Sequence, residues 1–302
     1  MIYPHEHLAI DLSGAKNDID CRLDLKDLVI AEFRELRDKG VEWIADLTNR
    51  GMGRDLPYAR DVEKASGVKV LHATGWYKEG FFPTEVYDGD VAALSRIMRD
   101  EIMESIEIED IEREDGDERG PRASVIGEIG TELDRISPEE ERVFIAAARV
   151  QAETGTPIIT HATLGRMGME QIGLLEKHGA SPSKVLISHV DLTHNLDYIL
   201  GLIDRGVTVG FDTIGKTSYL PDEFRVGMLK ELSKRGRCGS VVLSMDITRR
   251  SHLKQNGGVG YAYLIDDFLP RLRVSDNEGA PIPEKDIVLM THKNAARFLG
   301  RT

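Results

Sequence analysis

Short apolar segments alternate with longer helical patterns along the whole chain of 302 residues. Several short segments are rich in β-branched residues and apolar at nearly every position, as expected for strands buried on both faces. Such an alternation predicts an α/β fold, because each strand is followed by a helix that can cover the sheet. The eight predicted strands are Ile2–Leu8, Glu42–Leu47, Lys69–Ala73, Ala123–Ile129, Pro157–His161, Lys184–His189, Val207–Phe211 and Ser240–Met245.

Amphipathic helical patterns occupy the segments between these strands. Several of them end at a glycine, as at Gly40, Gly179 and Gly206, where a left-handed residue closes a helix most easily. The predicted helices are Leu25–Lys39, Pro57–Ala65, Val91–Ile102, Glu139–Glu153, Gly168–His178, Leu196–Asp204, Asp222–Lys234 and Tyr261–Leu272, with a closing helix at Thr291–Leu299.

Eight strands alternating with eight helices predict a single (β/α)8 TIM barrel over residues 1–302. The competing fold is a doubly wound parallel sheet, which favours a glycine-rich phosphate loop after its first strand. The first strand instead carries His5-Glu6-His7, so the barrel is the better interpretation. In such barrels the catalytic residues lie at the C-terminal ends of the strands.

The composition excludes several classes of protein. With 52 acidic and 39 basic residues the net charge is −13, whereas a general nucleic-acid binder needs a basic face. No apolar run approaches the roughly 20 residues that span a bilayer. The two cysteines, Cys21 and Cys238, have no metal or redox spacing, and they predict a reducing compartment without a disulfide scaffold.

The acidity is concentrated between Asp100 and Gly120, where eleven acidic residues are opposed only by Arg113 and Arg119. This segment therefore carries −9 of the net −13. We expect a solvated helix end that runs into a loop, with a partner-binding acidic segment as the alternative.

Histidines and carboxylates stand at the ends of five predicted strands. Side chains two residues apart share one face of a strand, so His5 and His7 can close on one ion. Imidazole combined with carboxylate suits Zn²⁺, Mn²⁺, Co²⁺ or Fe²⁺ better than Ca²⁺. Six ligands exceed the three of a single catalytic zinc site, so we predict two divalent ions, zinc first among them, that share a bridging carboxylate. The six candidates are His5, His7, Glu128, His161, His189 and Asp246.

Four other histidines lack this context and are interpreted as structural. His72 lies inside the third predicted strand, and His178 stands at a helix C-terminus, where it suits the helix dipole. His194 and His292 lie near helix starts.

The chain resembles the phosphotriesterase family of the amidohydrolase superfamily over essentially its whole length. The most specific segments are HEHLAIDLSGAKND near the start, GEIGT on the fourth strand, FDTIGK after the seventh and SMDITRRSHL on the eighth. The resemblance implies a binuclear metal site in a barrel, and it suggests a homodimer. The more buried ion would be held by His5, His7 and Asp246, and the more exposed ion by His161 and His189.

In the same scheme Glu128 and a hydroxide would bridge the two ions. Many members of the family use a lysine at this position of the fourth strand, and carbon dioxide must carboxylate that lysine before it can bridge. Glu128 is already a carboxylate, so we expect the bridge to form without bicarbonate.

The predicted chemistry is hydrolysis by hydroxide, since divalent ions lower the pKa of bound water. Asp246 would take the proton of the attacking hydroxide and pass it to the leaving group. We expect a metal-dependent hydrolase that cleaves an ester bond of a small anionic or phosphorylated substrate, such as a sugar lactone or carboxyl ester. A phosphodiester or phosphotriester is the alternative substrate. Cyclic-amide hydrolysis and non-catalytic metal binding rank below both.

Candidate substrate contacts lie in the loops after the third, seventh and eighth strands. Lys216, Arg249 and Arg250 suit an anionic group, because lysines and arginine forks bind phosphate. The alternative for both arginines is pairing with acidic neighbours. Trp76 and Tyr219 are candidates for the pocket wall, although aromatic residues also pack within loops.

The first ligand, His5, leaves no room for a cleaved signal peptide, so we expect a cytoplasmic protein. No feature predicts a membrane or nucleic-acid partner, and the expected partner is a small-molecule substrate.

Overall fold

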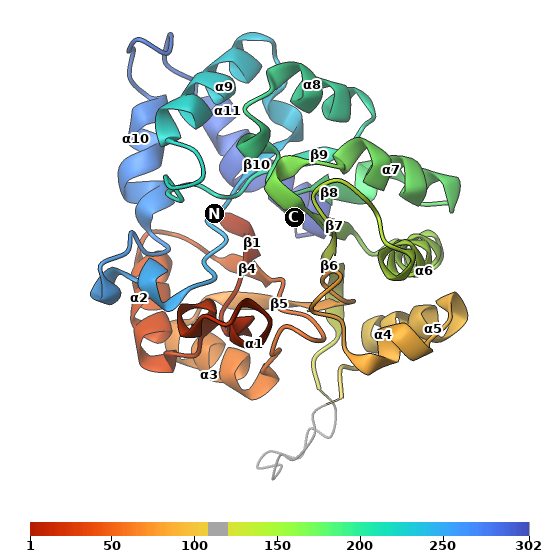
Figure 1. Cartoon of the computed structure of the whole chain (residues 1–302). Helices are drawn as coiled ribbons and strands as arrows, with labels where there is room; N and C mark the ends of the chain where they lie inside the picture. The colour runs from red at the N-terminus through yellow and green to blue at the C-terminus, as the bar shows by residue number, and fades with distance from the viewer. Residues whose placement is uncertain (108–119, 302) are drawn as a thin grey trace.

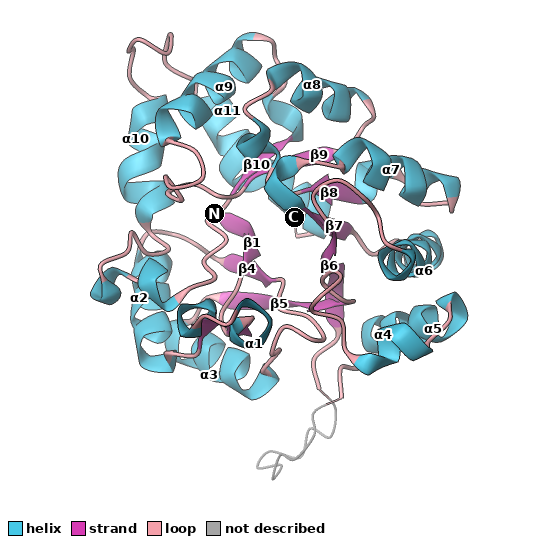
Figure 2. Ribbon diagram, in the orientation of Figure 1, coloured by secondary structure: helices cyan, strands magenta, loops and turns pink. Residues whose placement is uncertain are grey.

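The computed structural model describes residues 1–107 and 120–301. In this part of the chain, eight parallel strands form one sheet in the order β1-β4-β5-β6-β7-β8-β9-β10. The strands lie in a ring at the centre of the molecule, and the helices surround them (Figure 1). The predicted (β/α)8 barrel is confirmed, and the separation of central strands from outer helices is plain in Figure 2.

Each barrel strand falls on a predicted segment, although several strands end earlier than expected. The strands are β1 (Ile2–Glu6), β4 (Trp43–Asp46), β5 (Lys69–Thr74), β6 (Ala123–Thr131), β7 (Ile158–Ala162), β8 (Val185–Ile187), β9 (Thr208–Phe211) and β10 (Val241–Leu243). His7 and His189 therefore lie just beyond a strand rather than inside it, and Asp246 follows its strand at a distance of three residues. The chain turns at two of these positions, because His189 and Asp246 have left-handed φ angles of 60° and 50°.

The helices follow the predicted segments closely in the first seven units. They are α2 (Lys26–Asp38), α3 (Leu56–Ser66), α5 (Val91–Met103), α6 (Pro138–Thr154), α7 (Gly168–Lys177), α8 (Leu196–Asp204) and α9 (Asp222–Lys234). The expected left-handed glycines Gly40, Gly179 and Gly206 have φ angles of 86°, 96° and 86°. A short helix α4 (Thr84–Asp88) precedes α5 and was not predicted.

The eighth helix differs from the prediction of one helix over Tyr261–Leu272. A π-helical turn over Leu264–Phe268 leads into the short helix α10 (Leu269–Leu272). Pro270 stands in the first turn of α10, where its missing N–H is tolerated. The closing helix is likewise divided into α11 (Glu284–Val288), a π turn at Leu289–Lys293 and α12 (Asn294–Leu299).

Side chains join the first and last strands of the sheet. Ser244 follows β10, and its Oγ lies 2.8 Å from the carbonyl oxygen and 3.3 Å from the amide nitrogen of His5 on β1. Within the barrel, apolar residues of β1, β4, β5, β6, β7, β8 and β10 form a buried cluster with α12. The helix therefore packs against one end of the barrel interior and leaves the other end to the polar residues described below.

The segment between β1 and α2 contains a small hairpin that was not predicted. Strands β2 (Ile10–Asp11) and β3 (Arg22–Leu23) pair in antiparallel fashion, and the one-turn helix α1 (Ser13–Lys16) lies between them. In Figure 1 this segment lies at the front, over the lower part of the strand ring.

The acidic segment is only partly as expected. Residues 108–119 lie outside the described residues, but Glu101 on α5 is only 5% exposed. Its carboxylate accepts hydrogen bonds from Arg54 at 2.7 and 2.9 Å and from Arg50 at 2.9 Å. The expected solvated helix end is therefore wrong for Glu101, because two arginines from the loop after β4 reach the inner side of α5.

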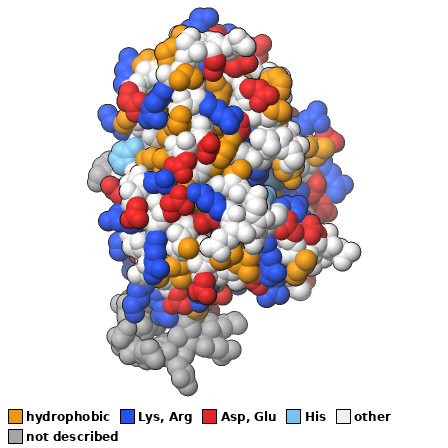
Figure 3. Space-filling view, turned by 90° about the vertical axis from the view of Figure 1, so that its left-hand side faces the viewer, with side chains coloured by type: hydrophobic (Ala, Val, Ile, Leu, Met, Phe, Trp, Pro, Cys, Tyr) orange, Lys and Arg blue, Asp and Glu red, His pale blue; other side chains and the backbone are white. Residues whose placement is uncertain are grey.

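Charge is mixed over the face of the molecule shown in Figure 3, where basic and acidic side chains are interleaved. No helix among residues 1–107 and 120–301 has both the length and the apolar character needed to cross a membrane.

Candidate metal centre

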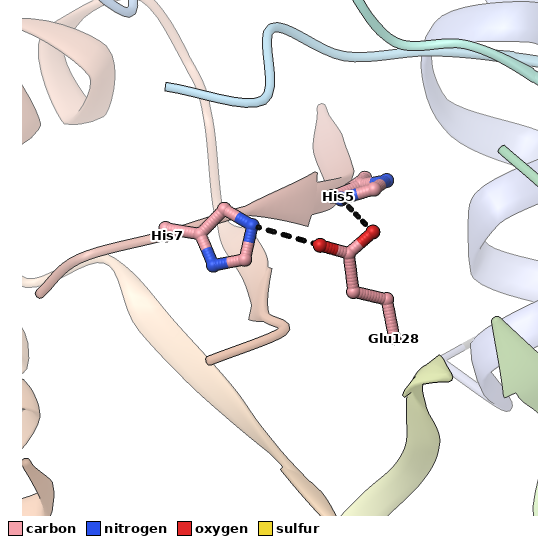
Figure 4. Close-up of side chains that lie close together, drawn as sticks. All are labelled: His5, His7 and Glu128. Carbon is pink, nitrogen blue, oxygen red and sulfur yellow. Dashed lines mark ion pairs between the residues drawn. The ribbon is translucent and has the colours of Figure 1, made fainter. Parts of the chain in front are cut away.

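The six predicted ligands converge at the C-terminal ends of the strands, with Glu128 of β6 in their middle. Its carboxylate oxygens lie 3.4 Å from Nε2 of His5 and 3.6 Å from Nε2 of His7, as Figure 4 shows. On the other side, Oε2 lies 3.1 Å from Nδ1 of His161 and 3.6 Å from Nε2 of His189. Glu128 therefore faces two groups of histidines at once.

The first group is completed by Asp246, which follows β10. Its Oδ1 lies 3.6 Å from Nε2 of His5 and 3.3 Å from Nε2 of His7. We refer to His5, His7 and Asp246 as the closed group, because both rings are fully buried. His161 and His189 form the open pair, in which Nδ1 of His161 lies 2.9 Å from Nε2 of His189. Both rings line a cavity that is described below.

The closed group has the properties of a cation site. The Nε2 atoms of His5 and His7 are buried, and none of the described residues gives them a hydrogen-bond partner. A buried polar atom without a partner costs about 1–3 kcal/mol, and such atoms call for an unseen ion or water. Imidazole nitrogens facing carboxylate oxygens are the donor set of Zn²⁺ and related ions. These residues therefore fit a divalent metal.

The opposite ring nitrogens are held by two residues that were not among the predicted site residues, Asp212 and Thr48. Oδ2 of Asp212 lies 2.9 Å from Nδ1 of His5, and its Oδ1 lies 2.9 Å from Nδ1 of His189. Oγ1 of Thr48 lies 2.9 Å from Nδ1 of His7. Such contacts fix the tautomer and orientation of a ligand ring and leave the other nitrogen for the metal. The position of Asp212 directly after β9 is the signal that could have identified it.

The carboxylates of the centre are held in their charged form. Burial by itself would raise the pKa of Glu128, but the adjacent imidazoles of His161 and His5 lower it well below its usual value. The same holds for Asp212, where burial is outweighed by His189 and His5. For Asp246, burial is outweighed chiefly by Lys216, which forms an ion pair with it and keeps its pKa low. The centre thus offers anionic oxygens to a cation.

The local backbone turns these side chains inward. A Cβ atom at Gly127 would lie 2.3 Å from the carbonyl oxygen of Ile159, so only glycine allows β6 to approach β7 this closely just before Glu128. Left-handed φ angles at His189 and Asp246 redirect the chain directly after β8 and β10. Strained residues of this kind cost about 1–3 kcal/mol each and are found mainly where neighbouring structure holds them for function.

A cavity of about 330 Å³ opens over the open pair, Glu128 and Asp246. Lysines bring positive charge to its wall, and Tyr77 contributes a hydroxyl 3.2 Å from Nε2 of His161. Burial, followed by the nearby Glu128, raises the pKa of Tyr77 well above its usual value, so the phenol keeps its proton. The three lysines of the wall are Lys16, Lys78 and Lys216.

Two predicted substrate contacts line this cavity, and three lie elsewhere. Lys216 and Tyr219 belong to its wall. Trp76 is fully buried, and its Nε1 donates a hydrogen bond to Glu85 at 2.6 Å.

Both arginines of the loop after β10 are occupied by the segment between β1 and α2. Arg249 pairs with Asp18 at 2.9 Å and Asp20 at 3.4 Å, and Arg250 pairs with Asp24. Arg249 also lines a neighbouring hollow, which shares Lys216 and Tyr219 with the cavity. The sequence left this pairing open because about 230 residues separate the partners.

The four histidines interpreted as structural stay apart from the centre. Among the described residues, none of them belongs to a potential metal-binding group or lines the cavity: His72, His178, His194 and His292.

A ring of parallel strands with imidazoles and carboxylates at its C-terminal ends defines the class of metal-dependent barrel hydrolases. The model of the Phosphotriesterase family matches residues 1–299, and the chain belongs to this family. The family consists of binuclear metal enzymes, and this chain is a metal-dependent hydrolase that acts on ester bonds.

Individual relatives support this assignment. The phosphotriesterase homology protein of Escherichia coli is 47% identical over 294 residues, which cover 97% of this chain and 96% of that protein. The crystal structure of that protein, with phosphate in its active site, aligns with a TM-score of 0.91 at 45% identity and covers 99% of this chain and 98% of the other.

Two more distant relatives carry activity names. The phospho-furanose lactonase of Mycoplasmopsis synoviae is 31% identical over 263 residues, covering 82% of this chain and 73% of its own. The aryldialkylphosphatase of Saccharolobus solfataricus is 32% identical over 220 residues, covering 72% and 66%.

Proposed function

We propose that this protein hydrolyses the ester bond of a small anionic substrate, a sugar lactone or carboxyl ester, with two divalent metal ions. The observation that carries the proposal is the position of Glu128 between the closed group and the open pair, at the floor of a cavity with three lysines in its wall. The phospho-furanose lactonase among the relatives supports a phosphorylated lactone as the substrate class.

In this proposal His5, His7 and Asp246 hold one ion and the open pair holds the other, while Glu128 contacts both. Zinc is the first choice of metal, and manganese, cobalt and iron suit the same ligands. When bound, the ions lower the pKa of water, which supplies the nucleophile, and they polarise the oxygen of the substrate.

Asp246 is the residue that moves the proton. Its carboxylate is ionised and lines the cavity, so it can accept the proton of the attacking water and release it to the leaving group. Lys216 pairs with Asp246 and keeps the carboxylate charged until a proton arrives.

Charge in the wall of the cavity favours an anionic substrate. Lys78 is paired with Glu132 at 2.9 Å, and Lys216 with Asp246, so both ammonium groups are held in place. Lys216 and Tyr219 are the proposed substrate contacts. Arg249 and Arg250 act indirectly, because their pairing with acidic residues holds the loop after β10 against the segment between β1 and α2.

A phosphodiester or phosphotriester is the second candidate substrate. The aryldialkylphosphatase among the relatives favours it, and the same nucleophile can attack phosphorus or a carbonyl carbon.

The test is metal analysis combined with a hydrolysis screen of sugar lactones, phosphorylated lactones, carboxyl esters and phosphate di- and triesters. We expect two metal ions per chain and the highest kcat/KM for a phosphorylated lactone, with Asp246→Asn as the control for contaminating activity. Faster turnover of a phosphotriester would establish the second candidate. Full metal content with no hydrolysis of any of these substrates would refute the proposal.

A further inference from the structure

Glu6 separates the two histidines of the first strand, yet it points away from the metal centre. Alternate side chains of a strand face opposite sides, so Glu6 cannot share the face of His5 and His7. It is fully buried, where an ionisable side chain needs strong partners. Its role in the sequence is otherwise unexplained.

The carboxylate of Glu6 finds its partners around Asp246, about 240 residues away. Its Oε1 accepts hydrogen bonds from the amide of Met245 at 2.7 Å and from Oγ of Ser244 at 2.8 Å. Its Oε2 accepts a hydrogen bond from the amide of Ile247 at 3.1 Å. The two oxygens are therefore divided between the amides of the residues that precede and follow Asp246.

Asp246 itself needs such support. Its φ of 50° is a left-handed conformation that residues other than glycine seldom adopt, so the neighbouring structure must hold it. The seam between β1 and β10 already has the contacts of Ser244 with the backbone of His5. A contact that only joined β1 to β10 would not require one carboxylate to accept hydrogen bonds from the amides of both Met245 and Ile247.

We propose that Glu6 is a positioning residue that fixes the backbone on both sides of Asp246 and thereby aims its carboxylate at His5 and His7. The inference rests on the proposed function in one respect, namely that Asp246 is a metal ligand. Through this contact, the segment that carries His5 and His7 also sets the direction of the Asp246 side chain.

The test uses Co²⁺ added to metal-free protein, followed by equilibrium dialysis and visible absorption. Glu6→Gln keeps the shape of the side chain, but one acceptor oxygen becomes an NH₂ group that faces a peptide N–H. One of the two hydrogen bonds from the amides of Met245 and Ile247 is therefore lost. We expect the tighter Co²⁺ site to weaken by about 10- to 100-fold, the range for losing an outer partner of a ligand, and its absorption spectrum to change.

Tyr3→Phe is the matched control for a destabilised first strand. Tyr3 lies on β1, is fully buried and donates a hydrogen bond to the carbonyl oxygen of Tyr261 at 3.1 Å, and its side chain forms no hydrogen bond with residues 244–247 in the described part of the chain. This variant should lower the melting temperature while the affinity and the spectrum of Co²⁺ stay as in the wild type.

If Glu6→Gln does not fold, Ser244→Ala carries the same test. It removes one donor to Oε1, and we expect the tighter site to weaken by about 2- to 10-fold, the worth of one hydrogen bond.

The inference would be overturned if a folded Glu6→Gln protein had the Co²⁺ affinity and spectrum of the wild type. If Glu6→Gln does not fold, the same result in Ser244→Ala would overturn it. A wild-type protein that binds two Co²⁺ ions but hydrolyses no ester would refute the proposed function alone, because the Co²⁺ comparison still decides the role of Glu6.

Discussion

The two parts of the metal centre differ in what their rings can do without a metal. In the open pair, Nδ1 of His161 lies 2.9 Å from Nε2 of His189, so each ring can satisfy the other. In the closed group, the Nε2 atoms of His5 and His7 are buried and have no hydrogen-bond partner among the described residues. Loss of an ion is therefore compensated in the open pair but leaves unpaired buried nitrogens in the closed group.

From this difference we expect the centre to bind its two ions with different affinities. The side chain of His161 is 14% exposed and contacts the cavity, whereas His5 and His7 are 0% exposed. An ion in the open pair can exchange with solvent and meet the substrate. An ion in the closed group stays with the protein and is the one that we expect to survive purification.

The largest effect should come from Asp246→Asn, because Asp246 belongs to the closed group and is also the residue that we propose to move the proton. We expect kcat to fall by about 10²- to 10⁴-fold, the usual contribution of a general acid–base, with a smaller change in KM. Steady-state kinetics at matched metal content measures it. A kcat within threefold of the wild type would show that another residue carries the proton.

Removal of one ring from each part tests the comparison directly. We expect His7→Asn to weaken the tighter ion by more than about 100-fold, since a direct ligand contributes more than its outer partners. His161→Asn should leave that ion in place and weaken only the second. Release of metal to a chelator should then show two phases in the wild type, the faster of them accelerated by His161→Asn.

Equal release rates for both ions, or acceleration of the slow phase by His161→Asn, would contradict the assignment of strong and weak sites.

Asp212 is shared by both parts, since it contacts His5 and His189. Asp212→Asn should therefore weaken both ions by about 10- to 100-fold. Thr48→Val is the matched control, because in the described part of the chain Oγ1 of Thr48 is hydrogen-bonded to His7 and to no other histidine of the centre, so the substitution should affect the tighter ion alone. Competition with a chromophoric chelator measures both affinities, and an Asp212→Asn effect confined to one ion would count against the shared role.

The smallest effects should appear in the loops above the open pair. Lys216→Met removes a charge from the cavity wall and should raise the KM of an anionic substrate more than that of a neutral one. Arg250→Ala breaks a hydrogen bond to the carbonyl oxygen of Arg22 at 2.7 Å and a partly exposed pair with Asp24. An exposed pair is worth about 0–1 kcal/mol, so the substitution should change either KM by less than about fivefold. A larger effect of Arg250→Ala on the anionic substrate would place that arginine at the substrate.

The sequence predicted the barrel and the strand-end histidines because both depend on local patterns. Strand and helix periodicity is readable within short windows, and the barrel then brings the ends of its strands together. Glu6 could not be assigned in this way, and the position of Asp212 after its strand did not show which rings it contacts, since both roles depend on atoms of distant strands. Glu101 looks solvated until the fold supplies its partners, and for Arg249 and Arg250 only the fold identifies the acidic partners that the sequence left open.

We propose that Glu128 lies between two ions, and a crystal structure of the zinc-loaded protein with anomalous diffraction at the zinc edge would reveal their positions. We expect two peaks, one beside His5, His7 and Asp246 and one beside His161 and His189, both in contact with the carboxylate of Glu128. A single peak in the fully loaded protein, or two peaks that Glu128 does not touch, would contradict it.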